Sequence, residues 1–292
     1  MTRIGLLDSG LGLLGTADAL FHLCPSVELV LAMDPDFTPY GSLSAADLEA
    51  RTLSSAAVLA EWEPDAIVIA CNTASVQALE AVRALYEPEI PVIGTVPAVK
   101  MAAGTGEDFA IWATPATTGS MYQQNLIDMF AADVAVAKVA CPGLAEAINV
   151  ADIPAIDAAI DAALDQMEPG METIVLGCTH YGLVADRIMA ARAGAITLFD
   201  SPIPVAKQTL RRIGDDLASA SSASAPGSVH SDTIHSDAEA AAGPSETDGS
   251  RASGGILATF ASGRRISLPE TLRAYPAGRR LLARERAATP RS

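Results

Sequence analysis

Two cysteines follow two apolar segments that share the same layout. Cys71 follows residues 66–70 and Cys178 follows residues 173–177, and hydroxyl or amide side chains come directly after each thiol. Each apolar segment is typical of a buried strand, and the carboxyl ends of parallel strands are where α/β sheets bind ligands. One such thiol would indicate a nucleophile. Two thiols at matching places in two halves indicate acid–base groups that face one substrate from opposite sides.

The neighbours of these thiols favour binding of a carboxylate. Asn72 and Thr73 follow the first cysteine, and Thr179 and His180 follow the second. N–H groups at the start of a following helix bind anions, and the same position lowers the pKa of a thiol. His180 can carry the proton of a general acid. A lone buried cysteine is more often a core residue, but two in this setting favour a functional role.

Another apolar segment, residues 4–7 near the N-terminus, is followed by a carboxylate and a row of glycines. Asp8 and Ser9 offer a base-like group, and they also fit a helix N-cap. Three glycines have the spacing of the G-x-G-x-x-G fingerprint: Gly10, Gly12 and Gly15. Only Asp34 and Asp36 come close to the ribose-binding acid of that fingerprint, so nucleotide binding is the weaker alternative.

A tyrosine lies in the loop that follows the strand expected at residues 27–33. Tyr40, between Pro39 and Gly41, can cover a small ligand, although a plain turn explains the segment equally well.

The cysteine count indicates reduced thiols. There are 4 cysteines, and their spacing matches neither a zinc motif nor a disulfide scaffold. Cys24 and Cys141 each precede a proline and lack the polar setting of the other two, so we expect both to be structural. We expect a cytoplasmic protein that needs no metal.

Composition excludes several classes of function. The 292 residues have a net charge of −16, which repels phosphate backbones and argues against nucleic-acid binding. No apolar run reaches the length of a membrane helix, and the N-terminus does not read as a signal peptide. Arginines are concentrated in residues 256–292, and we expect them to form a solvated face packed on an acidic body.

Expected strands and helices alternate in two series, which is typical of parallel sheets. Strands are expected at 4–7, 27–33, 66–70 and 91–94, then at 109–113, 134–140, 173–176 and 196–199. Helices are expected at 16–23, 45–61, 75–86, 119–130, 153–167, 183–193 and 202–213, with a closing strand at 256–260 and a closing helix at 268–286. The order predicts two similar parallel-sheet α/β lobes with pseudo-twofold symmetry and the active site in the cleft between them.

The predicted lobes are not continuous in sequence. The first comprises residues 1–96, 207–217 and 256–292, and the second comprises residues 97–206. Residues 218–255 are rich in Ser, Ala, Asp, Glu and Gly without periodicity, which predicts a disordered acidic insertion. His230 and His235 within it could bind a metal, but an incidental pair in a linker is the preferred interpretation.

Several motifs in family order resemble the cofactor-independent aspartate/glutamate racemase family. They are Asp8-Ser9-Gly10, Pro39-Tyr40-Gly41, Cys71-Asn72-Thr73-Ala74-Ser75, residues 92–100, Ala113-Thr114 with Thr117, Gly177-Cys178-Thr179-His180-Tyr181 and Asp200-Ser201. The resemblance covers residues 4–213 and is most specific at the two cysteine motifs.

The resemblance implies a two-base interconversion of L- and D-glutamate that supplies peptidoglycan synthesis and uses no cofactor. Cys71 and Cys178 would be the bases, with Asp8 and His180 assisting them respectively. The resemblance also implies which residues hold the substrate: Ser9, Tyr40, Gly41, Asn72, Thr73, Thr117 and Thr179.

Alternatives within the resemblance are a racemase for aspartate or another amino acid derivative, and a racemase fold with a secondary role in inhibiting DNA gyrase. A regulator without activity would have lost a cysteine or Asp8, and this chain retains all three. The oligomeric state stays open, a homodimer included.

Three features depart from the family pattern. Leu13 stands where relatives have a second glycine, and a bulkier residue there could shift the loop that carries Asp8. Asn149 stands where many relatives have a glutamate, with Glu146 as the nearest carboxylate, so a charge at position 149 is absent. The insertion is the third departure.

Overall fold

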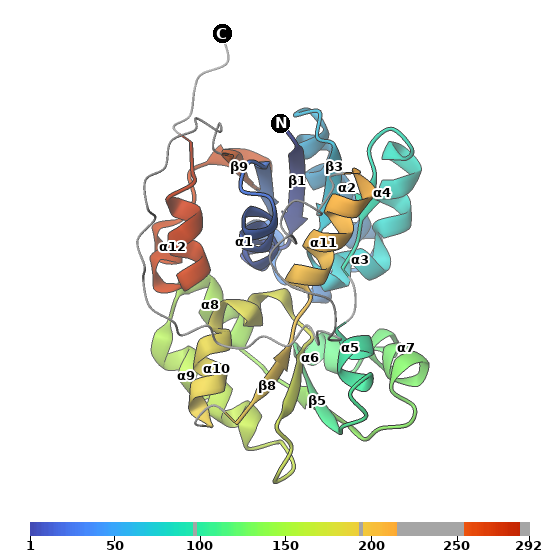
Figure 1. Cartoon of the computed structure of the whole chain (residues 1–292), viewed down its shortest axis with the longest axis vertical. Helices are drawn as coiled ribbons and strands as arrows, with labels where there is room; N and C mark the ends of the chain where they lie inside the picture. The colour runs from blue at the N-terminus through green and yellow to red at the C-terminus, as the bar shows by residue number, and fades with distance from the viewer. Residues whose placement is uncertain (96–97, 193–194, 215–253, 287–292) are drawn as a thin grey trace, which may run out of the picture.

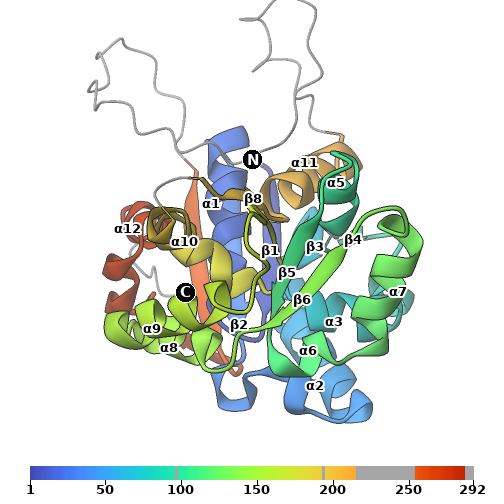
Figure 2. The ribbon, with the colours of Figure 1, turned by 90° about the horizontal axis from the view of Figure 1, so that it is seen from below.

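The strands form two separate sheets. The computed structural model describes residues 1–95, 98–192, 195–214 and 254–286. The first sheet has the order β10-β9-β2-β1-β3-β4 and the second has the order β6-β5-β7-β8. Figure 1 shows the first sheet and its helices in the upper half of the molecule and the second in the lower half, and Figure 2 gives the view from below.

The strand bounds follow the alternation expected from the sequence. The first sheet contains β1 (Arg3–Asp8), β2 (Glu28–Met33), β3 (Ala66–Ile69), β4 (Val92–Ile93), β9 (Gly255–Ala261) and β10 (Arg264–Ile266). The second contains β5 (Phe109–Ala113), β6 (Val136–Ala140), β7 (Thr173–Leu176) and β8 (Thr197–Phe199). Most of these strands are buried along their length, as expected for sheets covered on both faces.

Both sheets contain the same four-stranded arrangement. In each, the second, first, third and fourth strands of the series lie side by side and pair in parallel. The first sheet adds β9, parallel to β2, and β10, antiparallel to β9. The prediction of an α/β fold with two similar parallel-sheet lobes is therefore confirmed.

Helices connect the strands and cover the sheets. They are α1 (Leu13–Leu23), α2 (Ala45–Ala60), α3 (Asn72–Gln77), α4 (Leu79–Tyr86), α5 (Val99–Ala103), α6 (Pro115–Thr118), α7 (Met121–Phe130), α8 (Leu144–Val150), α9 (Ile153–Leu164), α10 (Ala185–Ala191), α11 (Pro202–Arg212) and α12 (Pro276–Leu282). Short 3₁₀ turns lie at Pro35–Phe37, Tyr40–Ser42, Thr179–Val184 and Glu270–Ala274. Within the described residues, no helix is long and apolar enough to cross a membrane.

Local sequence explains where several helices begin. The side chains of Ser44, Ser120 and Asp152 each accept an N–H from the first turn of α2, α7 and α9. Such caps satisfy backbone donors that have no partner inside the helix.

The structure differs from the expected elements in several places, among them α5 and β10, where no element was expected. The expected helix 268–286 is a 3₁₀ turn followed by α12, because a proline at 276 forces the preceding Tyr275 to be extended. The expected helix 75–86 is divided at Ala78 into α3 and α4. The expected helix 183–193 begins only at α10, after a 3₁₀ turn. Helix α8, which was not expected, follows a left-handed Gly143.

One apolar cluster joins the two sheets. It contains Leu6 of β1, Leu20 of α1, Leu176 of β7 and Leu210 of α11, all of them buried. Burial of apolar surface across the contact stabilises one sheet against the other. The boundary predicted between residues 206 and 207 falls within α11, which packs along α1 (Figure 1).

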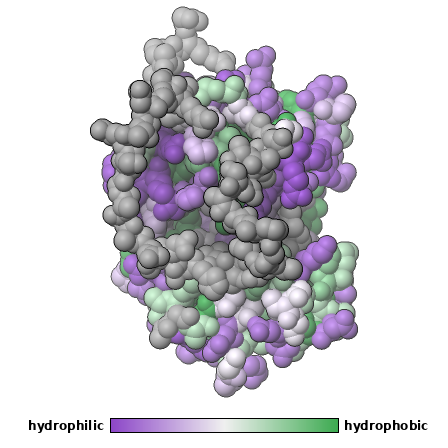
Figure 3. Space-filling view, viewed as in Figure 1, coloured by the Kyte–Doolittle hydropathy of each residue, from purple (hydrophilic) through white to green (hydrophobic). Residues whose placement is uncertain are grey.

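The arginines near the C-terminus pack on the acidic N-terminal part of the chain. Arg280 pairs with Asp18 and Arg286 with Glu28. These contacts agree with the expected basic face on an acidic body. In Figure 3 hydrophilic residues gather in the upper half of the visible face, while both kinds of residue mix in the lower half.

The predicted disordered insertion, residues 218–255, lies outside the described residues except at its end. Gly254 donates its N–H to the carbonyl of Pro25, and Gly255 begins β9.

Candidate active site

One pocket lies where the carboxyl ends of β1, β3 and β7 meet. It is lined by all eleven residues that the sequence singled out: Asp8, Ser9, Tyr40, Gly41, Cys71, Asn72, Thr73, Thr117, Cys178, Thr179 and His180. Cys71 lies two residues beyond β3, and Cys178 lies two residues beyond β7. Because β3 and β7 are the third strands of their series, the two thiols occupy equivalent positions in the two sheets.

Asp8 is a buried carboxylate that joins the two sheets. It is 1% exposed, and its Oδ2 accepts the hydroxyl of Thr179 at 3.0 Å. Its Oδ1 accepts the hydroxyl of Ser9 and the N–H of Gly10, both at 3.3 Å. Burial raises the pKa of Asp8 to about 6, against the opposing effect of these hydrogen bonds. The N-cap alternative is wrong, since Gly12 precedes α1 and no side chain caps it.

The glycines after Asp8 allow the second lobe to come close. A Cβ at Gly10 would lie 2.7 Å from Nε2 of His180, and one at Gly12 would collide with the Thr179 hydroxyl. Leu13, the first departure from the family pattern, is fully buried at the start of α1.

The carboxylate of Asp34 is engaged by protein groups, so it is not available as a ribose acid. These contacts argue against the nucleotide-binding alternative.

Cys71 is a buried thiol that keeps its proton at neutral pH. Burial first, and the charge of Asp8 second, raise its pKa to about 12. N–H groups of Ala74 and Ser9 act in the opposite direction, as the position before α3 predicts, but their effect is smaller. The expectation that the helix N-terminus would lower the thiol pKa is therefore wrong in its net direction.

Cys178 and His180 form a pair. Nδ1 of His180 lies 3.8 Å from Sγ of Cys178, and its Nε2 lies 3.1 Å from Oδ1 of Asn149. Burial raises the pKa of Cys178 far above its usual value, and it lowers the pKa of His180 to about 4. The histidine is therefore a neutral imidazole at neutral pH.

The two thiols affect each other's ionisation. After burial, the negative charges of Asp8 and Cys71 are further causes that raise the pKa of Cys178. A thiolate on one side of the pocket thus favours a protonated thiol on the other. One thiolate and one protonated thiol are the base and the acid that a two-base racemisation requires.

Polar groups complete the lining of the pocket. Asn72 donates its amide N–H to the carbonyl of Gly177 at 2.9 Å, which is a second link between the sheets. Thr117 accepts the hydroxyl of Thr114 at 3.1 Å, which fixes the threonine pair at the start of α6. Thr73 and Gly41 also face the pocket.

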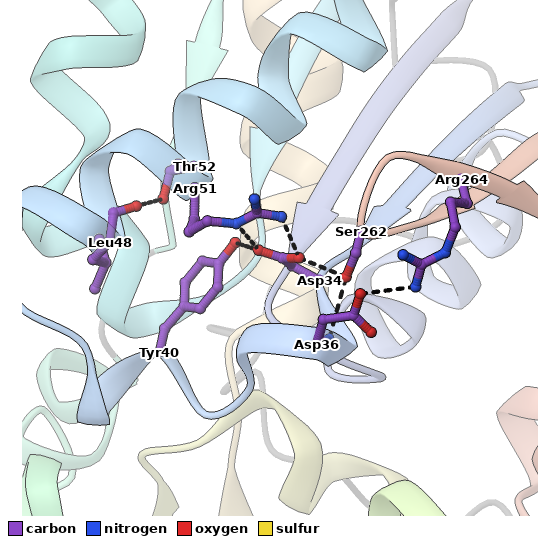
Figure 4. Close-up of polar contacts among 8 residues, drawn as sticks. All are labelled: Asp34, Asp36, Tyr40, Leu48, Arg51, Thr52, Ser262 and Arg264. Carbon is purple, nitrogen blue, oxygen red and sulfur yellow. Dashed lines mark hydrogen bonds and ion pairs between the residues drawn. The ribbon is translucent and has the colours of Figure 1, made fainter.

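Tyr40 lines the pocket, but its hydroxyl is engaged elsewhere. The hydroxyl donates to Oδ2 of Asp34 at 2.9 Å, and Arg51 binds both oxygens of the same carboxylate at 2.7 Å (Figure 4). Ser262, in the turn between β9 and β10, donates to Oδ1 of Asp34 at 2.7 Å. Arg264 binds Asp36 beside them. This network, formed by Asp34, Tyr40, Arg51 and Ser262, fixes the tyrosine against α2.

The two cysteines that were expected to be structural lie outside the pocket. Cys24 and Cys141 do not line it, and Cys141 is buried in the apolar cluster. Within the described part of the chain, no group of three His, Cys, Asp or Glu side chains could hold a metal. His230 and His235 lie outside the described residues.

Sequence reasoning missed three features of the site. Thr38 and Ala145 line the pocket, but the sequence around them contains no motif that indicates a site. Asn149 was recognised only as a missing charge, although its side chain contacts His180. The partners of Tyr40 come from α2 and from the distant β9–β10 turn, so no local pattern could reveal them.

Comparison with known proteins gives the class of the molecule. A family model described as Asp/Glu/Hydantoin racemase matches residues 17–209. A glutamate racemase from Pseudomonas entomophila is 34% identical over 218 residues, which cover 73% of this chain and 82% of that protein. One from Roseiflexus sp. is 37% identical over 72% of this chain and 78% of that protein. The chain therefore belongs to the Asp/Glu/hydantoin racemase family, and it is an amino-acid racemase, which is a kind of isomerase.

Solved structures agree with this assignment. Glutamate racemase from Aquifex pyrophilus is 30% identical, with a TM-score of 0.58 over 74% of this chain and 85% of that chain. The Escherichia coli glutamate racemase, solved with L-glutamate and the activator UDP-MurNAc-Ala, has a TM-score of 0.68 over 94% of this chain and 92% of that chain. At 24% identity the second comparison supports the two-lobe fold alone.

Proposed function

We propose that this chain interconverts L- and D-glutamate by direct proton transfer between Cα of the substrate and two thiols. The observation that carries the proposal is the equivalent placement of Cys71 and Cys178 after β3 and β7, both facing one pocket. Relatives at 34–37% identity are glutamate racemases, which favours glutamate as the substrate.

The reaction needs one thiolate and one thiol. The thiolate takes the α-proton from one face, and the electron pair left at Cα is delocalised into the adjacent carboxylate. The opposite thiol then donates its proton to the other face, so no proton or electron is gained or lost overall. We assign Cys71 to the proton of D-glutamate and Cys178 to that of L-glutamate, following the family resemblance.

The remaining residues bind and orient the substrate. A carbanion formed without a cofactor has no electron sink, so preorganised donors must stabilise the developing negative charge. Asn72, Thr73, Thr117 and Thr179 line the pocket, and we assign them to the carboxylates. The hydroxyl of Thr179 already donates to Asp8, so this residue would contribute its backbone N–H. Asp8, with its pKa of about 6, is largely ionised at neutral pH and suits the substrate ammonium.

We further propose that the two sheets are the cores of two lobes with the boundaries predicted above, and that the enzyme works in the cytoplasm, where its thiols stay reduced. There it would supply D-glutamate for peptidoglycan.

The test is racemisation without any added cofactor. Protein dialysed against a chelator is incubated with D-glutamate, and circular dichroism follows the optical signal. We expect the signal to decay to zero, and in D₂O we expect deuterium at Cα of both enantiomers. An unchanged signal, or activity only after pyridoxal phosphate is added, would contradict the proposal. Faster reaction of D-aspartate in parallel would favour the aspartate alternative.

A further inference from the structure

Asn149 lies between two groups that determine how its amide is oriented. Its Oδ1 is 3.1 Å from Nε2 of His180 and 3.5 Å from the backbone nitrogen of Leu11. A backbone N–H can only donate a hydrogen bond, so the atom that faces Leu11 must be the amide oxygen. The same oxygen therefore faces His180, and it can only accept.

This orientation fixes the tautomer of the histidine. Because Oδ1 of Asn149 accepts, Nε2 of His180 must carry the ring proton. In a neutral imidazole the other nitrogen then has a free lone pair, and this nitrogen, Nδ1, is the atom that faces Sγ of Cys178 at 3.8 Å. The sulfur can donate its proton towards Nδ1, but it cannot receive one from it.

We infer that Asn149 is a positioning residue that holds His180 as the neutral Nε2–H tautomer, so that Cys178 rests as the protonated thiol, the proton donor of the pair. The inference rests on the proposed function. It assigns a role to a residue that the sequence indicated only as a missing charge. A carboxylate at this position would stabilise an imidazolium, whose Nδ1–H could donate to a Cys178 thiolate.

The surroundings of His180 agree with a neutral ring. The side chain is 4% exposed, and burial is the cause that lowers its pKa. The ionisable groups that line the pocket with it are Asp8, Tyr40, Cys71, Glu146 and Cys178. The helices α8, α1 and α10 pack against its turn. Helix α8 carries Glu146, and the other two carry Asp18, His22, Asp186 and Arg187. Among these, Asp18 pairs with Arg280, and Arg187 pairs with Asp157.

The first test reads the tautomer directly and needs no activity. Protein labelled with ¹⁵N-histidine is examined by NMR between pH 6 and pH 8, and the His180 signals are assigned by their loss in His180→Gln. We expect one ring proton, on Nε2, throughout this range. A proton on Nδ1, or an imidazolium at pH 7, would overturn the inference. The tautomer itself is read in the wild-type protein, and His180→Gln serves only to assign the signals.

The second test measures ionisation of Cys178. The rate of its alkylation by iodoacetamide is followed against pH by mass spectrometry in wild type, Asn149→Asp and Asn125→Asp. Asn125 is exposed on α7, so the last variant makes the same charge change away from the site. We expect the alkylation rate of Cys178 at a given pH to rise about tenfold or more in Asn149→Asp alone, because an adjacent opposite charge on the histidine lowers the thiol pKa by about one unit or more.

Superimposable profiles for Asn149→Asp and wild type, with circular dichroism showing both folded, would overturn the inference. So would an equal shift in Asn125→Asp. Racemase activity of the wild type is assayed separately. A failure of the proposed function would appear there, whereas a failure of this inference would appear in the tautomer and in the alkylation profile.

Discussion

At the scale of single residues, burial controls the ionisation of the candidate site. It raises the pKa of both thiols and of Asp8, and it lowers the pKa of His180. At pH 7 the resting pocket thus holds two protonated thiols, a neutral imidazole and a largely ionised carboxylate. Binding of the substrate ammonium would favour a thiolate beside it, which links catalysis to substrate binding.

The ionisation of Asp8 should govern the acidic side of the pH profile. Its pKa of about 6 lies above that of His180 at about 4, so kcat/KM should fall as the pH drops through about 6. We expect Asp8→Asn to remove this acidic limb and to lower kcat/KM at pH 8 by roughly 10²-fold. Asp133→Asn, at an exposed position, serves as the control. An acidic limb that persists unchanged in Asp8→Asn would assign it to another group.

The chemistry-bearing residues were predictable from sequence because their signal is local. Each thiol comes directly after an apolar strand and is followed by amide or hydroxyl side chains. This pattern lies within a few consecutive residues, and it places Cys71 and Cys178 at the carboxyl edge of a sheet. The signs of the pKa shifts were not predictable. The N–H of Ala74 at the start of the helix acts as expected on Cys71, but burial has the larger effect.

At the scale of elements, the Asp34 network holds the pocket-lining loop against α2 and the β9–β10 turn. Asp34 is fully buried and Arg51 is partly buried, so removal of one partner would leave a charge uncompensated. Ser262 follows Asp34 by 228 positions. Long-range partners of this kind cannot be read from sequence, whereas the strands and most helices could be, from their periodicity and caps.

Tyr40→Phe distinguishes a structural hydroxyl from a substrate-binding one. Since the hydroxyl donates to Asp34, its loss should lower the free energy of unfolding by about 1–2 kcal/mol. We expect kcat to be retained and KM to rise less than about threefold. Steady-state kinetics and urea unfolding give both values. A much larger increase in KM, with unchanged stability, would mean that the hydroxyl binds substrate.

The carboxylate after β8 should make stability depend on pH. Asp200 is buried, and burial raises its pKa to about 7 from 3.8. Between these values the folded state binds more protons than the unfolded state, so this group lowers the free energy of unfolding as the pH rises. In Asp200→Asn the side chain does not titrate, so this pH dependence is lost. The amide oxygen of the new asparagine can still accept the N–H of Ser201.

The measurement is urea unfolding of Asp200→Asn and wild type at pH 5 and pH 8. The variant should gain stability relative to wild type between these values, by at most roughly 3 kcal/mol, because about two pH units separate pH 5 from the folded-state pKa of about 7 and each unit corresponds to about 1.4 kcal/mol. The exposed Asp133→Asn should show no such gain. A difference between Asp200→Asn and wild type that is the same at both pH values would contradict the prediction.

At the scale of the whole molecule, the site exists only where the two lobes meet. Asp8 and Cys71 come from the first sheet, and Cys178 and His180 come from the second. The hydrogen bonds Thr179–Asp8 and Asn72–Gly177 cross between them. The repeated strand order in the sequence predicted two similar lobes, but how closely they approach depends on side chains that periodicity does not describe.

Gly12→Ala should separate the lobes without unfolding them. The new Cβ would collide with the Thr179 hydroxyl and lie 2.7 Å from Oδ2 of Asp8. Because a displacement of about 1 Å can lower a rate by roughly 10²-fold, we expect kcat/KM to fall by that order. Gly119→Ala, where the nearest atom to the new Cβ is 3.7 Å away, should be active. Full activity of Gly12→Ala would show that the lobes adjust freely.

The central claim is that the two thiols act on opposite faces of one substrate, and single-cysteine variants test it most directly. A 3-chloroglutamate loses its α-proton and then chloride, so its elimination needs one base, whereas racemisation needs both thiols. Cys71→Ser and Cys178→Ser are assayed for both reactions with each enantiomer. We expect racemisation of glutamate to collapse in both variants, while Cys71→Ser eliminates only from the L-configured substrate and Cys178→Ser only from the D-configured one. Equal loss of both eliminations in both variants, or good racemisation by Cys71→Ser, would contradict the two-thiol account.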